Sequence, residues 1–166
     1  MAGETLSIAR TSAVGLGAIA DSFTVTDGTG TPCFTFRYHM HIASQEWTVS
    51  DSAGAEIGTM SRHAHMHPTF NLERPGRDPV TIRKADFMPT HQTWQIDGAE
   101  GGDVTISGSF NDHEFTFTNA AGQQVAEASR RWVSVHDGYG VQLNGLDGLI
   151  AACAAIAIDV AEHEDH

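Results

Sequence analysis

The chain has 166 residues, the length of one ordinary domain with a core of its own. Hydrophobic residues make up 40% of it and charged residues 18%, a composition that excludes a disordered chain and a coiled coil. Nine Lys and Arg residues against 21 Asp and Glu residues give a formal net charge of −12, which argues against nucleic-acid binding because phosphate backbones are bound by clustered basic side chains.

A β-hairpin pattern occurs three times along the chain. Residues 47–62 align without a gap with residues 115–130, and residues 23–38 repeat the same pattern. In each copy, alternating aromatic or β-branched and polar residues lead to an Asp/Asn-x-x-Gly sequence, after which the alternation resumes. Asp and Asn side chains form turns with their own backbone, and Gly is common where such turns need a positive φ. The pattern therefore predicts three strand-turn-strand units.

Shorter alternating segments lie between these hairpins, each bounded by Pro, Gly or Asp. They cover residues 69–72, 80–83, 92–96 and 104–110. About ten to twelve strands in one domain would leave two unpaired edges unless the sheet closed on itself. We therefore expect a mainly β fold, a closed antiparallel barrel of roughly twelve strands.

The C-terminal part departs from the strand pattern. Residues 144–148 supply N-cap candidates, and an Ala-rich sequence of high helix propensity follows as far as about residue 161. Residues 149–158 are apolar without interruption, so this helix is expected to be surrounded by protein on every side. A single domain is expected over 1–166, with strands over about 5–143 and a central helix over about 146–161.

The apolar run of this helix is too short to span a membrane. It is ten residues long, whereas a transmembrane helix needs about 20. Residues 1–5 also lack the basic region of a secretory signal. We therefore expect no transmembrane segment and a cytoplasmic location.

The Asp-x-x-Gly hairpins are followed by an Arg, and Lys84 follows residues 80–82. A strand at 139–143 comes next, then Asp147 and an Ala-Ile-Ala-Ile-Asp ending at 155–159. In this order, these features resemble the LURP-one-related family over roughly residues 23–162. That family shares the tubby C-terminal-like fold with the phospholipid scramblases, so the resemblance implies a twelve-stranded β-barrel around a hydrophobic C-terminal helix.

The resemblance also implies a type of function. LURP-one-related proteins have no established catalytic reaction, and tubby domains bind phosphoinositides through basic clefts, so a non-enzymatic phospholipid- or ligand-binding protein is implied. The chain has one lysine, and it lacks a cysteine cluster for acylation and a dense acidic calcium segment. The resemblance is therefore not taken to imply that this protein scrambles lipids.

Four of the nine basic residues fall within one short segment around the sequence Pro-Gly-Arg-Asp-Pro at 75–79. Guanidinium groups make bidentate contacts with phosphate, so the segment is the candidate ligand-binding site for an anionic headgroup. The alternative is a solvated loop whose positive charges are balanced by Glu73, Asp78 and Asp86. The candidate ligand-binding residues are Arg74, Arg77, Arg83 and Lys84.

Alternating histidines form a second candidate site, for a metal ion. Alternate residues of a strand share a face about 6.5 to 7 Å apart, so two or more histidines can hold one metal ion. The His-x-His sequence at 39–41 with the acid after it also resembles, in part, the first metal motif of the cupins, which hold iron, manganese or zinc. The alternative is a set of surface histidines. The candidate metal ligands are His39, His41, Glu46, His63, His65 and His67.

The sequence contains no motif for nucleophilic catalysis or for a nucleotide cofactor, such as Gly-x-Ser-x-Gly or a Walker loop. Cys33 and Cys153 lack Cys-x-x-Cys spacing and are expected to pack as small hydrophobic residues. Asp159 is expected to bond to barrel backbone or to an Arg rather than to act as a catalytic acid. No cofactor is expected.

The leading hypothesis is a non-enzymatic tubby-like barrel that binds a lipid headgroup, a small ligand or another protein. The first alternative is a metal-dependent β-barrel enzyme of the cupin type that uses the histidines. The second is a structural or self-assembling scaffold. The sequence leaves the oligomeric state open.

Overall fold

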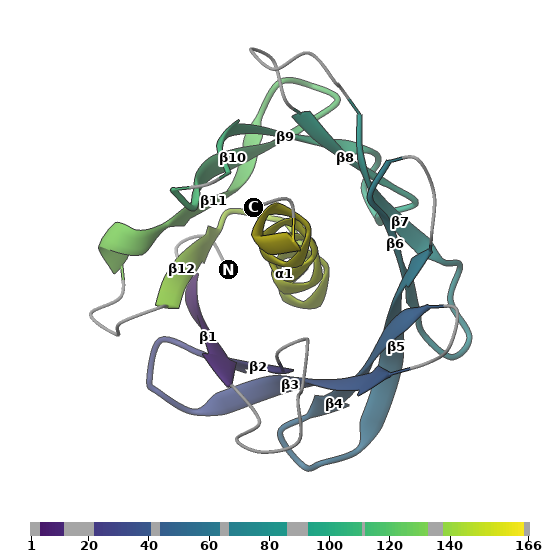
Figure 1. Cartoon of the computed structure of the whole chain (residues 1–166). Coiled ribbons are helices and arrows are strands. Elements are labelled where there is room, and N and C mark those ends of the chain that lie inside the picture. Colours follow the sequence, from purple (N-terminus) through teal and green to yellow (C-terminus); the bar gives the residue numbers. More distant parts are fainter. Residues whose placement is uncertain are drawn as a thin grey trace.

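Twelve strands enclose one central helix in the computed structural model, which describes residues 4–11, 22–40, 44–63, 67–85, 93–110, 112–132 and 138–164 (Figure 1). The strands are β1 (Glu4–Thr11), β2 (Ser22–Thr26), β3 (Pro32–Met40), β4 (Gln45–Asp51), β5 (Glu56–His63), β6 (Thr69–Glu73), β7 (Val80–Lys84), β8 (Thr93–Asp97), β9 (Val104–Ser109), β10 (Glu114–Asn119), β11 (Gln124–Ser129) and β12 (Gly138–Leu143). A 3₁₀ helix, η1 (Arg130–Trp132), follows β11, and the chain ends in α1 (Gly148–Glu164).

The sheet is a closed barrel. Each strand pairs antiparallel with its neighbours in chain order, and β1 pairs with β12 to complete the circle. Leu6 lies opposite Val141 and Ile8 opposite Tyr139 across this last junction, with buried side chains on both strands. The expected closed barrel of roughly twelve strands is confirmed, and closure leaves the sheet without an edge.

The three Asp/Asn-x-x-Gly hairpins are built alike, as predicted. The Oδ1 atom of Asp27 accepts hydrogen bonds from the backbone N–H groups of Thr29 and Thr31, at 2.9 and 3.0 Å. Asp51 and Asn119 accept the two equivalent bonds in their own turns. The glycine of each turn has a positive φ, which residues with a Cβ rarely adopt. These are Gly30 (85°), Gly54 (82°) and Gly122 (83°).

Successive connections alternate between the two ends of the barrel, because every strand is antiparallel to the next. One end carries the β2–β3, β4–β5, β6–β7, β8–β9 and β10–β11 turns, the start of β1 and the β12–α1 connection; we name it the Arg74 end. The helix finishes at the opposite end, which we name the Asp159 end. The two ends therefore surround opposite termini of α1.

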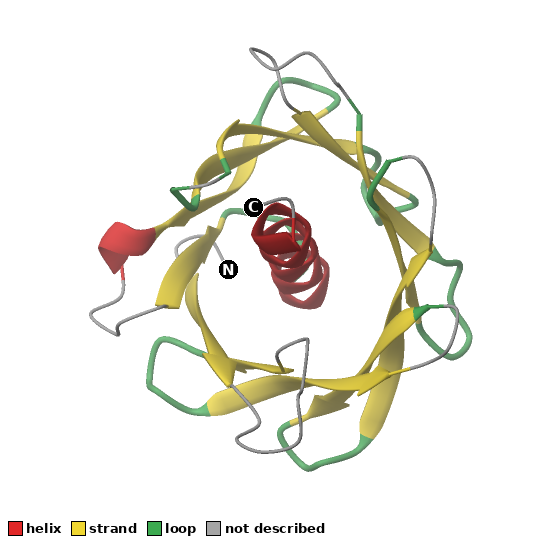
Figure 2. Ribbon diagram, viewed as in Figure 1, coloured by secondary structure: helices red, strands yellow, loops and turns green. Residues whose placement is uncertain are grey.

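The helix occupies the interior of the barrel (Figure 2). Its residues from 149 to 161 are buried, and it packs against β12, β1, β6 and β7. Asp147 is the N-cap: its Oδ1 accepts a hydrogen bond from the N–H of Ile150 at 3.0 Å. The predicted central helix is thus confirmed, but it begins at Gly148 because the cap is Asp147 and not an earlier residue. No helix in the described part of the chain is long and apolar enough to cross a membrane.

Large aromatic side chains fill the space between the helix and the barrel wall. Trp47 and Trp94 are fully buried, and Phe70 lies between them with ring centroids 6.2 and 6.4 Å away. Tyr38 continues this row on the other side of Trp47, at 5.3 Å. Inward residues from several neighbouring strands therefore form one core with the helix.

Candidate functional site

The four basic residues of the predicted ligand-binding site are separated by the length of β7. Arg74 and Arg77 lie in the β6–β7 turn at the Arg74 end, whereas Arg83 and Lys84 finish β7 toward the Asp159 end. Five strand residues span about 17 Å. The structure therefore does not bring the four side chains to one place.

Three of the four basic side chains are paired with carboxylates. These carboxylates are not those of Glu73 and Asp78, which the sequence suggested, and Asp86 lies outside the described residues. The partners come instead from β8, from the β8–β9 turn and from α1. The pairs are Arg77 Nη1 with Glu100 Oε1 (2.7 Å), Arg83 Nε with Asp97 Oδ2 (2.9 Å), and Lys84 Nζ with Glu162 Oε1 (3.6 Å).

Arg74 differs from the other three. It follows the inward-facing Phe70 and Leu72 in the alternation of β6, and its Nε atom is buried without a hydrogen-bond partner. The guanidinium makes no hydrogen bond or ion pair with any described residue. Burial raises the pKa of the Cys153 thiol in α1, and the positive charge of Arg74 partly opposes that rise. The charge of Arg74 thus acts on the helix, and no carboxylate of a described residue forms an ion pair with it.

A pocket of about 490 Å³ opens at the Arg74 end, between the start of α1 and the wall formed by β1, β3, β5 and β12. Its size falls within the usual range for small-molecule sites. We call it the mouth pocket. Most of its wall is apolar, and its charged members are two arginines and two acids. The lining residues are Glu4, Leu6, Cys33, Phe34, Ile57, Arg74, Pro75, Arg77, Leu143, Asp147, Gly148 and Leu149.

The start of the helix does not act as the anion receptor of this pocket. Asp147 already accepts a hydrogen bond from Ile150 with its side chain and another from the N–H of Ala151 with its backbone oxygen, at 2.9 Å. A carboxylate therefore already occupies the positive end of the helix dipole. Among the described lining residues, Arg74 is left as the cation without a partner.

A second hollow, of about 460 Å³, lies on the other side of Arg74. We call it the acidic groove, because two glutamates of β5 and β6 line it. It shares Arg74 and Pro75 with the mouth pocket, so this arginine stands between the two spaces. The lining residues are Glu56, Gly58, Thr59, Glu73, Arg74 and Pro75.

The predicted metal ligands lie near the Asp159 end of their strands. His39 in β3 is directly opposite Glu46 in β4, while His63 ends β5 and pairs in register with Thr69. His67 precedes β6, and His41 and His65 lie outside the described residues. Among the residues that are described, no group of three or more His, Cys, Asp or Glu side chains is placed to hold a metal ion. The metal site stays a hypothesis from the sequence.

A partly buried cluster of polar side chains lies at the Asp159 end, and the sequence did not predict that these residues meet. Arg10 Nη2 donates to Asp159 Oδ2 at 2.8 Å, and His113 Nε2 lies 3.0 Å from Asp159 Oδ1. Arg130 donates to His113 Nδ1, so the proton of the neutral ring is on Nε2 and points to Asp159. Burial would raise the pKa of Asp159, but the hydrogen bond from His113 and the charge of Arg10 outweigh it and lower that pKa. Asp159 is therefore bonded to an arginine, as expected.

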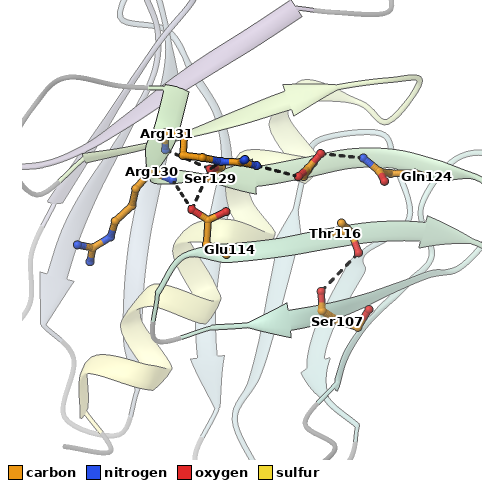
Figure 3. Close-up of polar contacts among 8 residues, drawn as sticks. Ser107, Glu114, Thr116, Gln124, Ser129, Arg130 and Arg131 are labelled. Carbon is orange, nitrogen blue, oxygen red and sulfur yellow. Dashed lines mark hydrogen bonds and ion pairs between the residues drawn. The ribbon is translucent and has the colours of Figure 1, made fainter.

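A second polar cluster lies where β11 meets η1, beside the start of β10 (Figure 3). The Ser129 hydroxyl donates to Glu114 Oε1 at 2.9 Å and accepts from the backbone and side-chain nitrogens of Arg131. Ser129 is fully buried. Because its hydroxyl is buried and hydrogen-bonded to an acid without a histidine base, this cluster holds η1 against the barrel and offers no activated nucleophile.

A family model and a solved structure match the chain over most of its length. The family model described as LURP-one-related matches residues 6–159. The fold is similar to the crystal structure of a protein from Arabidopsis thaliana, with a TM-score of 0.63 and 16% sequence identity, covering 96% of this chain and 93% of that chain. No curated protein matches the chain.

Proposed function

The chain belongs to the LURP-one-related family, and from its barrel fold and the mouth pocket we propose that it is a binding module for a small amphiphilic anion. The ligand places a carboxylate or phosphate on Arg74 and an apolar part against the pocket wall. The observation that carries this proposal is the guanidinium of Arg74, which lines the pocket and has no hydrogen-bond or ion-pair partner among the described residues.

Arg74 is half-buried, and its Nε atom is enclosed without an acceptor, which is unfavourable. Leaving such a group unsatisfied costs about 1 to 3 kcal/mol, and more when the group is charged. A carboxylate or phosphate in the mouth pocket would supply two acceptor oxygens in the planar geometry that a guanidinium matches. Binding would therefore remove an existing penalty in addition to making new contacts.

The apolar part of the ligand has a matching wall. Leu6, Leu143 and Leu149 are nearly buried where β1, β12 and α1 meet, and Phe34 and Ile57 are half-buried at the rim. Burial of apolar surface contributes about 25 cal/mol per Å². A short alkyl chain therefore gains free energy here that inorganic phosphate does not.

The proposal is for binding rather than catalysis. Cys33 lines the mouth pocket, but its Sγ donates to the backbone oxygen of Val25 at 3.3 Å. Burial and the nearby Asp27 raise the pKa of this thiol. A thiol with a raised pKa is a poor nucleophile.

Octyl phosphate, used below its micelle-forming concentration, tests the proposal by isothermal titration calorimetry. We expect saturable binding by the unaltered protein and a loss of at least tenfold in affinity for Arg74→Gln, because charge-assisted hydrogen bonds contribute about 1.5 to 3 kcal/mol. Arg77→Gln is the matched control, since Arg77 lines the same pocket but is exposed and already paired with Glu100. Equal affinity of the Arg74→Gln variant and the unaltered protein would reject Arg74 as the receptor.

The position of the ligand can be read from the two cysteines. Cys33 lines the pocket and Cys153 is fully buried in α1, so a maleimide reagent is expected to modify Cys33 slowly, because of its raised pKa, and in preference to Cys153 in the folded protein. Bound octyl phosphate should slow this reaction. An unchanged rate at saturating ligand would show that the ligand binds elsewhere.

A further inference from the structure

The acidic groove gives the ligand a second charge requirement. Glu56 and Glu73 line it, and neither side chain makes a hydrogen bond or ion pair with another described residue. Arg74 separates this groove from the mouth pocket and belongs to both linings. An anionic group bound to Arg74 would therefore have an apolar wall on one side and two free carboxylates on the other.

The wall of the groove includes Gly58, a residue without a side chain. A Cβ atom on Gly58 would lie 2.8 Å from the backbone oxygen of Glu73 and 3.3 Å from Cγ of Arg74. The backbone of β5 consequently approaches the end of β6 closely, and Arg74 packs over it. A side chain at position 58 would therefore displace Arg74 or the end of β6 from the wall of the groove.

The surroundings of the groove disfavour a ligand that carries only negative charge. Among the described residues of the Arg74 end, Arg74 and Arg77 are the basic side chains, and Arg77 is paired with Glu100. A group with positive charge would be attracted by the remaining acids, since the negative potentials of several carboxylates around a partly enclosed site add together. The acids at this end are Glu4, Asp27, Asp51, Glu56, Glu73, Asp78, Asp97, Glu100, Asp103 and Asp147.

We propose that the ligand is a zwitterionic amphiphile: its apolar tail lies in the mouth pocket, its phosphate or carboxylate binds Arg74, and an ammonium group one short linker further on lies in the acidic groove between Glu56 and Glu73. This proposal rests on the proposed function, because it takes Arg74 as the receptor of the anionic group. It adds a reason for selectivity, since phosphate alone satisfies the arginine but not the glutamates.

Four probes with related structures separate these contributions: octyl phosphocholine, octyl phosphate, octyltrimethylammonium and phosphocholine without a tail, all below their micelle-forming concentrations. Octyl phosphocholine should bind about fivefold or more tightly than octyl phosphate, the gain from two partly exposed charge contacts. Phosphocholine without a tail should bind at least tenfold more weakly than octyl phosphocholine. Equal affinities for octyl phosphocholine and for phosphocholine would show that the protein binds a free headgroup. That result would reject the proposal that the ligand is an amphiphile.

The groove itself is tested by the double variant Glu56→Gln/Glu73→Gln. We expect its affinity for octyl phosphocholine to fall to that for octyl phosphate, while octyl phosphate binds as well as before or better. Asp103→Asn is the control, because it removes one negative charge from the same end outside the groove. Glu56 and Glu73 are exposed at the rim, so both variants should keep the circular dichroism spectrum of the unaltered protein.

The outcomes distinguish the two proposals. If octyl phosphate binds at least as tightly as octyl phosphocholine, or if the double variant keeps the preference, the zwitterion is rejected while the anion-binding function stands. If no probe with an anionic group binds, or if Arg74→Gln has no effect, both proposals are rejected.

Discussion

Asp159 is the side chain that fixes the C-terminal half of α1 inside the barrel. It lies near the end of an apolar helix, and its carboxylate is bonded to Arg10 of β1 and to His113, which precedes β10. His113 has a φ of 57°, and its ring stacks on Tyr139 with centroids 4.5 Å apart. Removing one partner of such a buried pair leaves the other charge uncompensated, so the loss exceeds the net contribution of the pair.

We expect Asp159→Asn to lower the free energy of unfolding by about 2 to 3 kcal/mol at pH 7. The pKa of Asp159 is lower in the folded protein than its ordinary value of 3.8. Its stabilising effect is therefore complete above about pH 5 and is lost as the pH falls through the lowered folded value. Urea unfolding followed by tryptophan fluorescence at pH 7, 5 and 3 should show the difference between the two proteins shrinking only between pH 5 and 3.

The exposed Asp103 provides the control for this comparison. Asp103→Asn should change the free energy of unfolding by less than about 0.5 kcal/mol at each pH. A difference between Asp159→Asn and the unaltered protein that stays constant down to pH 3 would show that the carboxylate charge does not stabilise the fold.

The sequence predicted that Asp159 bonds to barrel backbone or to an arginine, without deciding between the two or indicating which arginine. Arg10 and Asp159 are 149 positions apart, and they meet because β1 closes the barrel against β12 while α1 returns through its centre. The basic segment shows the opposite case, in which residues close in sequence are far apart in the structure. Arg74 and Lys84 are close in sequence, yet β7 carries them to opposite ends. Of the four basic residues, Arg74 is the one without an ion-pair partner among the described residues, and residue types alone do not reveal this difference.

At the scale of elements, the three Asp/Asn-x-x-Gly turns are the features that the sequence predicted most completely. Everything they need is local: one side-chain oxygen that accepts two backbone N–H groups, and a glycine with positive φ three positions later. The strand register also shifts next to each turn, between Val25 and Thr26, Val49 and Ser50, and Phe117 and Thr118. Such a bulge depends on the pairing of two strands and was not predicted.

Asn119 provides a test of this turn. Asn119→Ala removes the acceptor of the two bonds from Ala121 and Gln123 and should lower the free energy of unfolding by about 1 kcal/mol. Asn119→Asp keeps the oxygen and makes the turn like those at Asp27 and Asp51, so it should change stability by less than about 0.5 kcal/mol. Urea unfolding measures both variants. Equal losses for the two would show that the side-chain oxygen is not what stabilises the turn.

At the scale of the whole molecule, charge is unevenly distributed along the barrel axis. The Arg74 end carries ten described acids and two arginines, while the other seven Lys and Arg residues lie in the middle of their strands or toward the Asp159 end. The helix begins at the acidic end, so the positive end of its dipole faces the negative charge. This arrangement favours the observed direction of α1, but it also places many carboxylates close to one another.

Repulsion between these carboxylates should make stability depend on salt. Charges within about 10 Å interact appreciably at 0.1 M salt and over longer distances in more dilute solution. We therefore expect the free energy of unfolding to rise by about 1 kcal/mol between 10 and 150 mM NaCl at pH 7, measured by urea unfolding. The double variant Glu56→Gln/Glu73→Gln removes two of the repelling charges and should show a smaller rise. A fall in stability with salt would instead show that attractive pairs, such as Arg77 with Glu100 and Arg83 with Asp97, outweigh the repulsion.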